Sequence, residues 1–397
     1  MKIVTVIGAR PQFVKAAAVS RAIAEYNNSI STQHAMINEI IVHTGQHFDA
    51  NMSDIFFEEM QIPQPHYHLE IHSLSHGAMT GRMLEQIEAV LLNEKPDYVM
   101  VYGDTNSTLA GALAACKLHI KVIHVEAGLR SFNMKMPEEI NRILTDRISD
   151  ILCCPTETAI GHLKREGIDT TLAESVNHPL VVETGDVMLD AALYYSKFSQ
   201  KKSTLVRDLQ LEEREFVLCT IHRAENTDDP ERLSGICEAL KEISNQIKVV
   251  LPLHPRTRKI FESSNATSAS ANSGSSDSLI IIDPVGYFDM LELLKQTSIV
   301  MTDSGGLQKE AYFFGKPCVV LRDETEWTEL MEKGYNVLAG ATHSGIINAF
   351  RQVSKRNIQI EPGIYGKGEA AHNIINALQK CQPASTNISE LPKTISA

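Results

Sequence analysis

Short aliphatic runs alternate with longer amphipathic segments along most of this 397-residue chain. Consecutive Val and Ile positions are typical of parallel strands buried on both faces, and apolar positions three or four residues apart are typical of helices. The expected strands are Ile3–Ile7, Glu39–His43, Tyr98–Tyr102, Val122–Val125, Ile151–Cys153, Phe216–Thr220, Val249–Pro252, Ile280–Ile282, Ile299–Thr302 and Cys318–Leu321. Helices are expected in the gaps between the strands, for example Val14–Tyr26, Ala78–Asn93, Thr108–Leu118, Pro137–Ile148, Pro230–Ile243 and Gln308–Phe314. This alternation predicts an α/β fold with parallel sheets.

The strand–helix rhythm forms two series, separated by a break at residues 185–214. Because a chain of this length exceeds one ordinary core, each series is expected to form its own domain. We therefore predict two Rossmann-like, doubly wound domains that face a central cleft. Ligands of such folds bind at the carboxyl ends of the strands, so this cleft is the expected site.

The end of the chain refines the expected domain boundaries. Glu369–Cys381 has helical spacing, and a last helix often crosses back to the first domain in two-lobed folds of this kind. We expect a first domain of residues 1–185 plus 366–381 and a second domain of residues 186–365. The polar segment Ser263–Ser278 is expected to be a flexible loop, and the polar tail 382–397 to be disordered.

Charge and composition argue against several classes of protein. Lys and Arg number 37 against 49 Asp and Glu, which gives a net charge of −12, whereas binding to a nucleic-acid backbone needs a basic face. No apolar run is long enough to cross a bilayer, and the N-terminal segment lacks the cleavage pattern of a signal peptide. Seven cysteines, an odd number, do not form a disulfide framework. The composition predicts a cytoplasmic protein with neither nucleic acid nor a membrane as partner.

The segment after the expected strand Ile299–Thr302 has the pattern of an anion-binding turn. Ser304, Gly305 and Gly306 precede a helix, and Glu310 lies about one turn into it. Glycine lets backbone N–H groups approach an anion, and a helix N-terminus adds a favourable dipole. The turn is predicted to hold a diphosphate while Glu310 accepts from a ribose hydroxyl. The alternative is an ordinary strand–helix turn.

The first expected strand ends in GARPQFVK, which places Arg10 at a bend and Lys15 one turn into the next helix. This sequence is not G-x-G-x-x-G, the dinucleotide fingerprint, so no nicotinamide cofactor is expected. Two cations at one strand end suit a diphosphate or a negatively charged transition state. Because a lysine near a helix start opposes the helix dipole, a local anion explains Lys15 better than a solvated helix start does.

Carboxylates recur at two successive strand ends and at the next helix start. Asp104 and Glu126 each follow an expected strand, and Glu138 directly follows Pro137, which opens a helix. Acids placed in this way in one domain suit acid–base catalysis. An acid at a helix start can also be a dipole partner, which is the role expected for Glu139.

Histidines offer one further candidate for the site. His222 and Arg223 follow the expected strand Phe216–Thr220, beside the predicted diphosphate turn. His254 and Arg256 form a second such pair, for which a structural role is equally expected. A His-rich stretch suggests a metal site, but no acidic or cysteine partner follows it at ligand spacing, so we expect no metal. Its members are His66, His68, His72 and His76.

Together these motifs resemble a known family. The segments GARPQF, HTGQH, GDTNST, HVEAGLRS, MPEEINR, TIHRAEN, LPLHPR and TDSGGLQKE follow the order found in the non-hydrolysing UDP-N-acetylglucosamine 2-epimerases, over roughly residues 1 to 380. The resemblance implies the two-domain fold of nucleotide-sugar glycosyltransferases (GT-B-like), a UDP-sugar substrate and a homodimer. By position, it implies active-site roles for Arg10, Lys15, Asp104, Glu126, Glu138, Arg142 and His222, and UDP binding by Ser304, Gly305, Gly306 and Glu310.

The chemistry of this family needs no nicotinamide. Breaking the anomeric C–O bond of a UDP-aminosugar creates oxocarbenium character, which acidifies the C2 hydrogen. A carboxylate can then remove that proton to give a glycal, and readdition of UDP with a proton from the opposite face inverts C2. Arg10, His222 and the turn at Ser304 suit a diphosphate clamp, and the three acids suit the proton transfers.

Departures from the best-known members bear on the substrate. Trp327 replaces an arginine that contacts the nucleotide sugar, and Met290 stands where an aromatic residue often lies near uracil. The segments SFNMKMPEEINRILTDRISD and DETEW are most similar to a branch that acts on UDP-2,3-diacetamido-2,3-dideoxyglucuronate for surface polysaccharide. We favour this substrate, with UDP-N-acetylglucosamine close behind. The alternatives from other classes are a glycosyltransferase of the same fold and a UDP-sugar-binding regulator without turnover.

Overall fold

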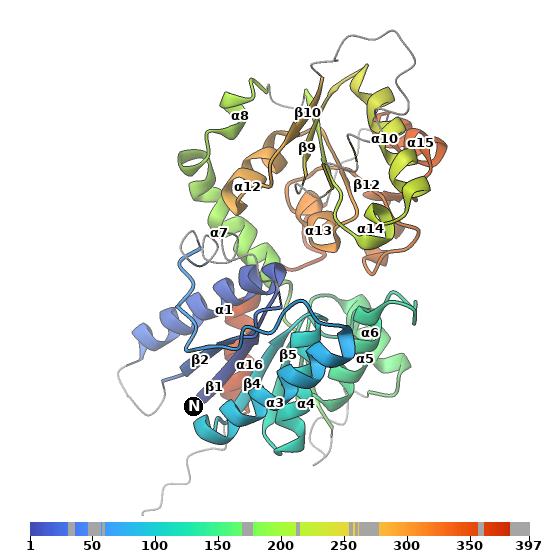
Figure 1. Ribbon diagram of the computed structural model, residues 1–397. Coiled ribbons are helices and arrows are strands. Elements are labelled where there is room, and N and C mark those ends of the chain that lie inside the picture. Colours follow the sequence, from blue (N-terminus) through green and yellow to red (C-terminus); the bar gives the residue numbers. More distant parts are fainter. Residues whose placement is uncertain are drawn as a thin grey trace, which may run out of the picture.

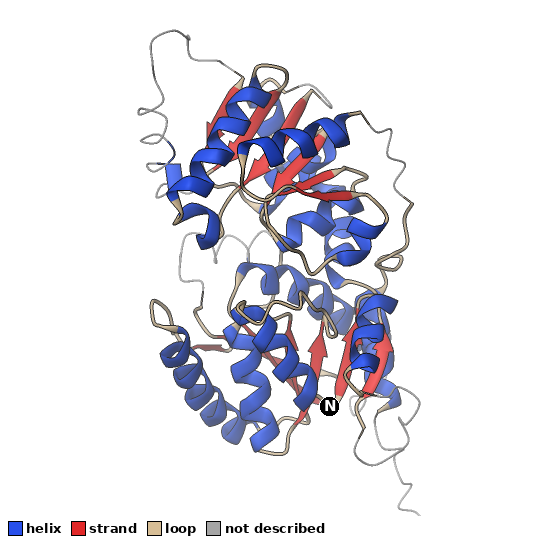
Figure 2. Cartoon of the chain, turned by 90° about the vertical axis from the view of Figure 1, so that its right-hand side faces the viewer, coloured by secondary structure: helices blue, strands red, loops and turns tan. Residues whose placement is uncertain are grey.

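The computed structural model describes residues 1–30, 36–46, 57, 60–168, 178–211, 215–253, 257–258, 261, 278–355 and 361–381. Within these residues the chain forms two parallel sheets, which lie in separate lobes (Figure 1). Helices lie on both faces of each sheet (Figure 2). The tail 382–397 and nearly all of the predicted loop at 263–278 fall outside the described residues.

The first sheet has seven strands in the order β3-β2-β1-β4-β5-β6-β7. Its central strands are buried along nearly their whole length, as the continuous aliphatic runs predict. The strands are β1 (Lys2–Ile7), β2 (Asn38–His43), β3 (Tyr67–His68), β4 (Tyr98–Tyr102), β5 (Lys121–Val125), β6 (Ile151–Cys154) and β7 (Leu180–Glu183).

The second sheet has six strands in the order β10-β9-β8-β11-β12-β13. All of its strand pairs are parallel, and helices form the crossovers wherever the connection is described. The strands are β8 (Phe216–Thr220), β9 (Lys248–Pro252), β10 (Leu279–Ile282), β11 (Ile299–Thr302), β12 (Cys318–Val320) and β13 (Asn336–Leu338).

Local sequence signals fix several of the helix starts. Proline stands at the beginning of α1, α5 and α10, and the Asp229 carboxylate caps α10 by accepting from two backbone N–H groups. The longer helices are α1 (Arg10–Ser29), α3 (His76–Glu94), α4 (Asn106–Lys117), α5 (Pro137–Ile148), α6 (Glu157–Arg165), α7 (Val187–Lys202), α10 (Pro230–Ser244), α12 (Tyr287–Gln296), α13 (Gly305–Phe313), α15 (His343–Ser354) and α16 (Ala370–Lys380). The short ones are α8 (Leu205–Asp208), α9 (Ala224–Thr227) and α14 (Thr328–Glu332).

The last described helix returns to the first lobe. Helix α16 packs on α1, and its apolar residues Ile374, Ile375 and Leu378 join the core that includes Val14 and Ile23. Helix α7 connects the lobes, because it packs on α1 and α16 of the first and on α12 and α13 of the second. No described helix combines the length and the apolar character that a membrane crossing requires.

The predicted α/β architecture is confirmed. All ten expected strands are present, each with ends within one residue of the prediction. The sequence analysis missed β3, β7 and β13, which are short strands at or near sheet edges, and it missed α7, which occupies much of the predicted break at residues 185–214.

The strand order reverses at one place in each sheet, and the segments that carry the predicted site residues follow the strands on either side of this place. In the first sheet β1 lies beside β4, so the start of α1, which carries Arg10, and the loop that carries Asp104 are neighbours. In the second sheet β8 lies beside β11, so the loops that carry His222 and Ser304 are neighbours. Such switch points are where open α/β sheets bind ligands.

Candidate active site

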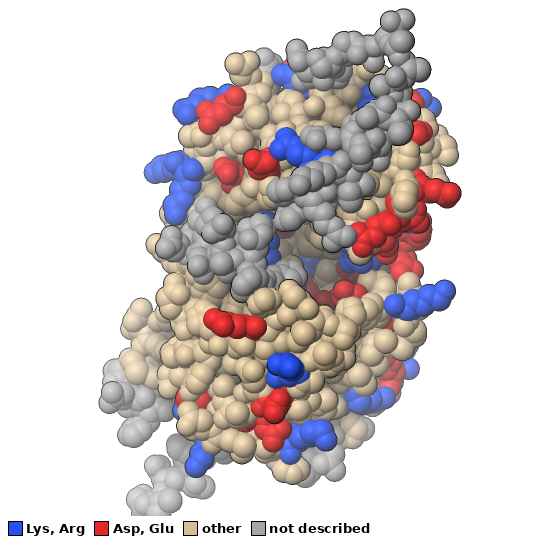
Figure 3. Space-filling view, in the orientation of Figure 1, with Lys and Arg blue, Asp and Glu red and all other residues tan. Residues whose placement is uncertain are grey.

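A cavity of about 580 Å³ lies between the lobes at the switch point of the second sheet. Figure 3 shows the hollow between the lobes, with basic and acidic side chains at its walls. Residues from both lobes line it, so it is open to a ligand that contacts both. The lining includes Arg10, Pro11 and Val14 of α1 and His222, Tyr287, Met290, Ser304, Gly306, Leu307 and Glu310 of the second lobe.

The predicted anion-binding turn forms the N-terminus of α13. Ser304 is the N-cap residue, and its hydroxyl accepts from the backbone N–H of Leu307 at 3.4 Å. A Cβ atom on Gly305 would lie only 2.3 Å from the Oε1 atom of Glu326, so glycine is required by a close approach there. The remaining N–H groups of this helix start are in position to hold an anion.

Glu310 lies on α13 at the inner wall of the cavity. It is buried, and the Tyr287 hydroxyl donates to its Oε1 atom at 3.0 Å. Burial raises the pKa of Glu310 to about 7. Arg10 lies close by, because its guanidinium donates to the carbonyl of Val285 at 3.1 Å. Met290 also lines this end of the cavity.

His222 reaches the cavity from the loop after β8, and its side chain is 62% exposed. Its Nδ1 atom lies 2.9 Å from the buried carboxylate of Asp303, which also accepts from the backbone N–H groups of His222 and Arg223. Burial alone would raise the pKa of Asp303, but the hydrogen bond from His222 and the charge of that histidine hold it below its ordinary value. Asp303 therefore fixes the position of the histidine.

Glu126 lies in a buried ionic network that joins the two lobes. Its carboxylate accepts from Lys15 of α1 and, at 2.7 Å, from Lys309 of α13. Lys309 also bonds to Asp186, the N-cap residue of α7, at 2.5 Å. Burial opposes ionisation of Glu126, but the two lysines lower its pKa to about 2. Glu126 is therefore ionised, and the anion beside Lys15 is this carboxylate.

Asp104 and Glu138 lie on the first-lobe side of the cleft. Asp104 is 29% exposed and accepts from the Arg142 guanidinium at 2.5 Å. Arg142 also bonds to the buried Glu139 at 3.0 Å, and Glu139 accepts from the backbone N–H of Ser131. Glu139 is thus structural, whereas Glu138 is half-buried in the first turn of α5.

A buried histidine, His124, lies between the backbone segments that carry Asp104 and Glu126. His124 of β5 is fully buried, with Nδ1 at 2.7 Å from Asp146 and Nε2 at 2.7 Å from the carbonyl oxygen of Gly103. Gly103 directly precedes Asp104, and Glu126 follows His124 by two residues. The histidine therefore connects the backbone that carries both carboxylates.

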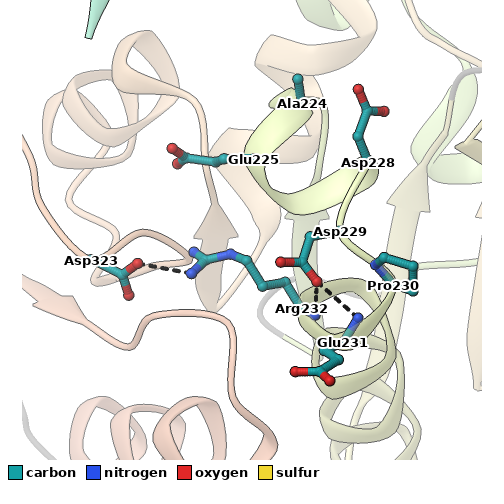
Figure 4. Close-up of a pocket in the computed structure, with 8 residues that line it drawn as sticks. All are labelled: Ala224, Glu225, Asp228, Asp229, Pro230, Glu231, Arg232 and Asp323. Atoms are coloured by element: carbon teal, nitrogen blue, oxygen red, sulfur yellow. Dashed lines mark hydrogen bonds and ion pairs between the residues drawn. The ribbon is translucent and has the colours of Figure 1, made fainter. Parts of the chain in front are cut away.

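A second hollow lies on the surface of the second lobe and has a different charge (Figure 4). It is lined by five acids and a single basic residue, Arg232, which pairs with Asp323 at 2.8 Å. The acids would repel a diphosphate, so the cavity between the lobes suits the predicted diphosphate better. Arg232 also donates to Asn226, whose amide donates to Asp303, so this surface supports the loop that carries His222.

The structure brings the predicted site residues to one cleft in two groups. Arg10, His222, Met290, Ser304, Gly306 and Glu310 line the cavity, with Gly305 in the same turn, and Lys15, Asp104, Glu126, Glu138 and Arg142 lie on the first-lobe side. The sequence analysis gave no role to Asp186, Asp303 or Lys309. Lys309 stands next to Glu310, and only the direction of its side chain would have revealed it. His254 and Arg256 lie outside the described residues.

Among the described residues, no group of three His, Cys, Asp or Glu side chains could hold a metal ion. Members of the His-rich stretch have separate partners. His66 accepts from the backbone N–H of Ile41 at 3.1 Å, and the ring of His76 lies 3.3 Å from the Asn106 amide.

Comparison with known proteins places this geometry in context. The family model described as UDP-N-acetylglucosamine 2-epimerase matches residues 30–379. A Pseudomonas aeruginosa protein named UDP-2,3-diacetamido-2,3-dideoxy-D-glucuronate 2-epimerase is 54% identical over 381 residues, which are 96% of this chain and 100% of that protein.

Solved structures agree with this match. The crystal structure of Methanocaldococcus jannaschii UDP-GlcNAc 2-epimerase in complex with UDP-GlcNAc and UDP is similar, with a TM-score of 0.82 and 40% identity over 96% of this chain and all of that one. The UDP-GlcNAc 2-epimerase from Neisseria meningitidis bound to UDP-GlcNAc has a TM-score of 0.80 and 30% identity, with the same coverage.

Proposed function

This chain belongs to the UDP-N-acetylglucosamine 2-epimerase family and is a UDP-sugar 2-epimerase, and from that premise we propose that it inverts C2 by eliminating and readding UDP. In the first step the bond between C1 and the UDP oxygen breaks and C2 loses its proton. The product is a glycal with a double bond between C1 and C2. In the second step UDP adds back to C1, and C2 receives a proton on the opposite face.

The observation that carries this proposal is the placement of carboxylates opposite the diphosphate turn. The N-terminus of α13 and the exposed imidazole of His222 stabilise the departing UDP anion. Arg10 lines the same cavity and completes the diphosphate clamp, and Glu310 accepts from a ribose hydroxyl at the nucleoside end. Asp104, Glu126 and Glu138 supply the proton transfers from the first lobe.

We propose that the substrate is UDP-2,3-diacetamido-2,3-dideoxyglucuronate, with UDP-N-acetylglucosamine as the second candidate. Support comes from the 54% identity to the P. aeruginosa protein, against 42% to the curated UDP-N-acetylglucosamine 2-epimerase of M. jannaschii. We also propose that residues 1–185 with 366–381 form the acid–base domain and residues 186–365 form the UDP-binding domain. Elimination and readdition need neither metal nor nicotinamide, so activity should persist in EDTA.

Incubation with each UDP-sugar in deuterium oxide tests the proposal. An epimerase incorporates deuterium at C2 without any acceptor and produces the C2 epimer. A glycosyltransferase of the same fold leaves C2 protonated, and a non-catalytic binder leaves the sugar unchanged. Absence of deuterium at C2 in both candidate substrates would refute the proposed reaction.

A further inference from the structure

Two buried side chains beside the diphosphate turn carry N–H groups without a partner. Arg322 is 1% exposed and Trp327 is 3% exposed, yet neither Nε of Arg322 nor Nε1 of Trp327 has a hydrogen-bond partner in the described structure. Buried N–H donors are nearly always paired because an unpaired one is costly. Two unpaired donors in one segment therefore point to a ligand that accepts from them.

These donors lie between the diphosphate turn and the acidic side of the cleft. A Cβ atom on Gly305 would lie 3.4 Å from Nε1 of Trp327, which places the indole at the start of α13. The Arg322 guanidinium reaches the first lobe, with NH2 at 3.9 Å from the sulfur of Met136. Met136 caps α5, two residues before Glu138. Neither Arg322 nor Trp327 lines the cavity itself, so a sugar attached to a diphosphate on the α13 turn, with C2 toward the acids, would meet these donors beyond the wall formed by Ser304 and Gly306.

The guanidinium has one edge left for an anion. Its NH1 group donates to Glu326 at 2.9 Å and its NH2 group to the sulfur of Met136 at 3.9 Å, while Nε has no hydrogen-bond partner among the described residues. A carboxylate binds a guanidinium best through two parallel N–H groups of one edge. The indole is itself held in place, because the Lys309 ammonium lies 4.1 Å from the centre of the Trp327 ring.

We propose that the Nε–NH2 edge of Arg322, together with Nε1 of Trp327, binds the C6 carboxylate of a uronate sugar. The inference rests on the proposed epimerase function and assigns the group that recognises its substrate class. A neutral sugar with a hydroxymethyl group at C6 would offer this edge no carboxylate, so Glu326 would remain the counter-ion of the guanidinium. The β-phosphate of UDP could supply the same anionic chemistry, and the test below separates the two sources.

The test uses two UDP-sugars that differ only at C6, UDP-2,3-diacetamido-2,3-dideoxyglucuronate and UDP-2,3-diacetamido-2,3-dideoxyglucose. For each, kcat/KM is measured by deuterium incorporation at C2. Arg322→Lys keeps a cation beside Glu326 but removes the Nε–NH2 edge, and it should lower kcat/KM for the uronate about 10- to 100-fold more than for the neutral sugar. Trp327→Phe removes the indole N–H. It should also lower kcat/KM for the uronate more than for the neutral sugar, but by a smaller factor than Arg322→Lys.

Arg351→Lys is the matched control, because Arg351 pairs with Glu242 on the exposed surface of α15. It should change neither kcat/KM value. Melting temperatures and calorimetric titration with UDP alone accompany each variant. Equal losses on both sugars, or a matching loss of UDP affinity, would overturn the carboxylate assignment, as would a wild-type enzyme without preference for the uronate. Failure of the epimerase proposal is distinct, because the wild type would then exchange C2 in neither sugar.

Discussion

The ammonium group of Lys309 lies 2.7 Å from the carboxylate of Glu126, although the two residues belong to different lobes. Lys309 is on the helix whose N-terminus forms the predicted diphosphate turn, and Glu126 is at the strand end that carries a predicted acid–base group. The helix that carries the predicted diphosphate turn and the acidic side of the cleft are therefore joined by one buried ammonium group.

Replacing Lys309 with methionine should destabilise the protein strongly. The substitution leaves the carboxylates of Glu126 and Asp186 buried beside each other with one cation, Lys15, remaining. Breaking a buried ion pair by removing one partner costs about 3–5 kcal/mol. Urea unfolding followed by circular dichroism measures the loss. Arg351→Gln breaks an exposed pair and should cost less than about 1 kcal/mol; equal effects would mean that the network contributes no special stability.

Variants of the three acids should separate catalysis from UDP binding. Asp104→Asn and Glu138→Gln should lower turnover about 10²–10⁴-fold while UDP affinity changes little, because general acid–base groups contribute that much. Glu126→Gln should lower turnover similarly but should also weaken UDP binding, since Glu126 holds Lys309 of α13. Steady-state kinetics and calorimetry with UDP measure both quantities. Near-full turnover in all three variants would remove the acid–base assignment.

The stability of the ligand-free protein should depend on Glu310. Its folded pKa of about 7 exceeds the ordinary value of 4.5, so the folded state binds more protons between these values. The contribution of this group to the free energy of unfolding is full below pH 4.5. It is lost as the pH rises through about 7, and the total loss is about 3 kcal/mol. In Glu310→Gln this fall should be absent. Urea unfolding of both proteins at pH 5 and pH 8 decides it, and parallel pH profiles would contradict the prediction.

Removing the Glu310 carboxylate should weaken UDP binding itself. Glu310→Ala deletes the predicted acceptor for a ribose hydroxyl, and hydrogen bonds to charged groups are worth about 1.5–3 kcal/mol. The expected loss in UDP affinity is therefore about 10- to 100-fold by calorimetric titration. UDP without a sugar is the right probe, because it reports on the nucleotide end of the cleft alone. An unchanged affinity in the folded variant would make Glu310 purely structural.

A side chain at Gly305 should disrupt the diphosphate turn. Even a Cβ atom would lie 2.3 Å from Oε1 of Glu326, so Gly305→Val must displace that carboxylate or the turn. UDP affinity should fall by more than about 10-fold, since backbone N–H groups lose their approach to the phosphate. Gly161→Ala on α6 is the control, because outside its own helix backbone no atom of the described residues lies within 4 Å of the added Cβ. If both variants bind UDP like the wild type, the turn has no part in phosphate binding.

The sequence predicts the strands and the strand-end residues well, and the reasons are local. A strand buried on both faces, such as Tyr98–Tyr102, must be apolar throughout, and its end determines where Asp104 begins the loop. The ionic network is not local. Lys309 bonds to Glu126, which lies 183 residues earlier in the sequence. Neither the apolar spacing of the helix nor the glycine turn indicates that the Lys309 side chain points to the other lobe. The edge strand Asn336–Leu338 was missed because its burial is incomplete.

The packing of α16 on α1 has a consequence for how the protein is made. A ribosome delivers the strands of the first sheet early, but the helix that completes the core beside them comes roughly 200 residues later, about 10–40 s at ordinary rates of synthesis. During this interval the apolar residues of α1 that later contact α16 remain exposed to solvent. Exposed hydrophobic surface of this kind is what chaperones bind. A chain terminated before Ala370 would carry an intact second sheet beside a first lobe that lacks one wall of its core.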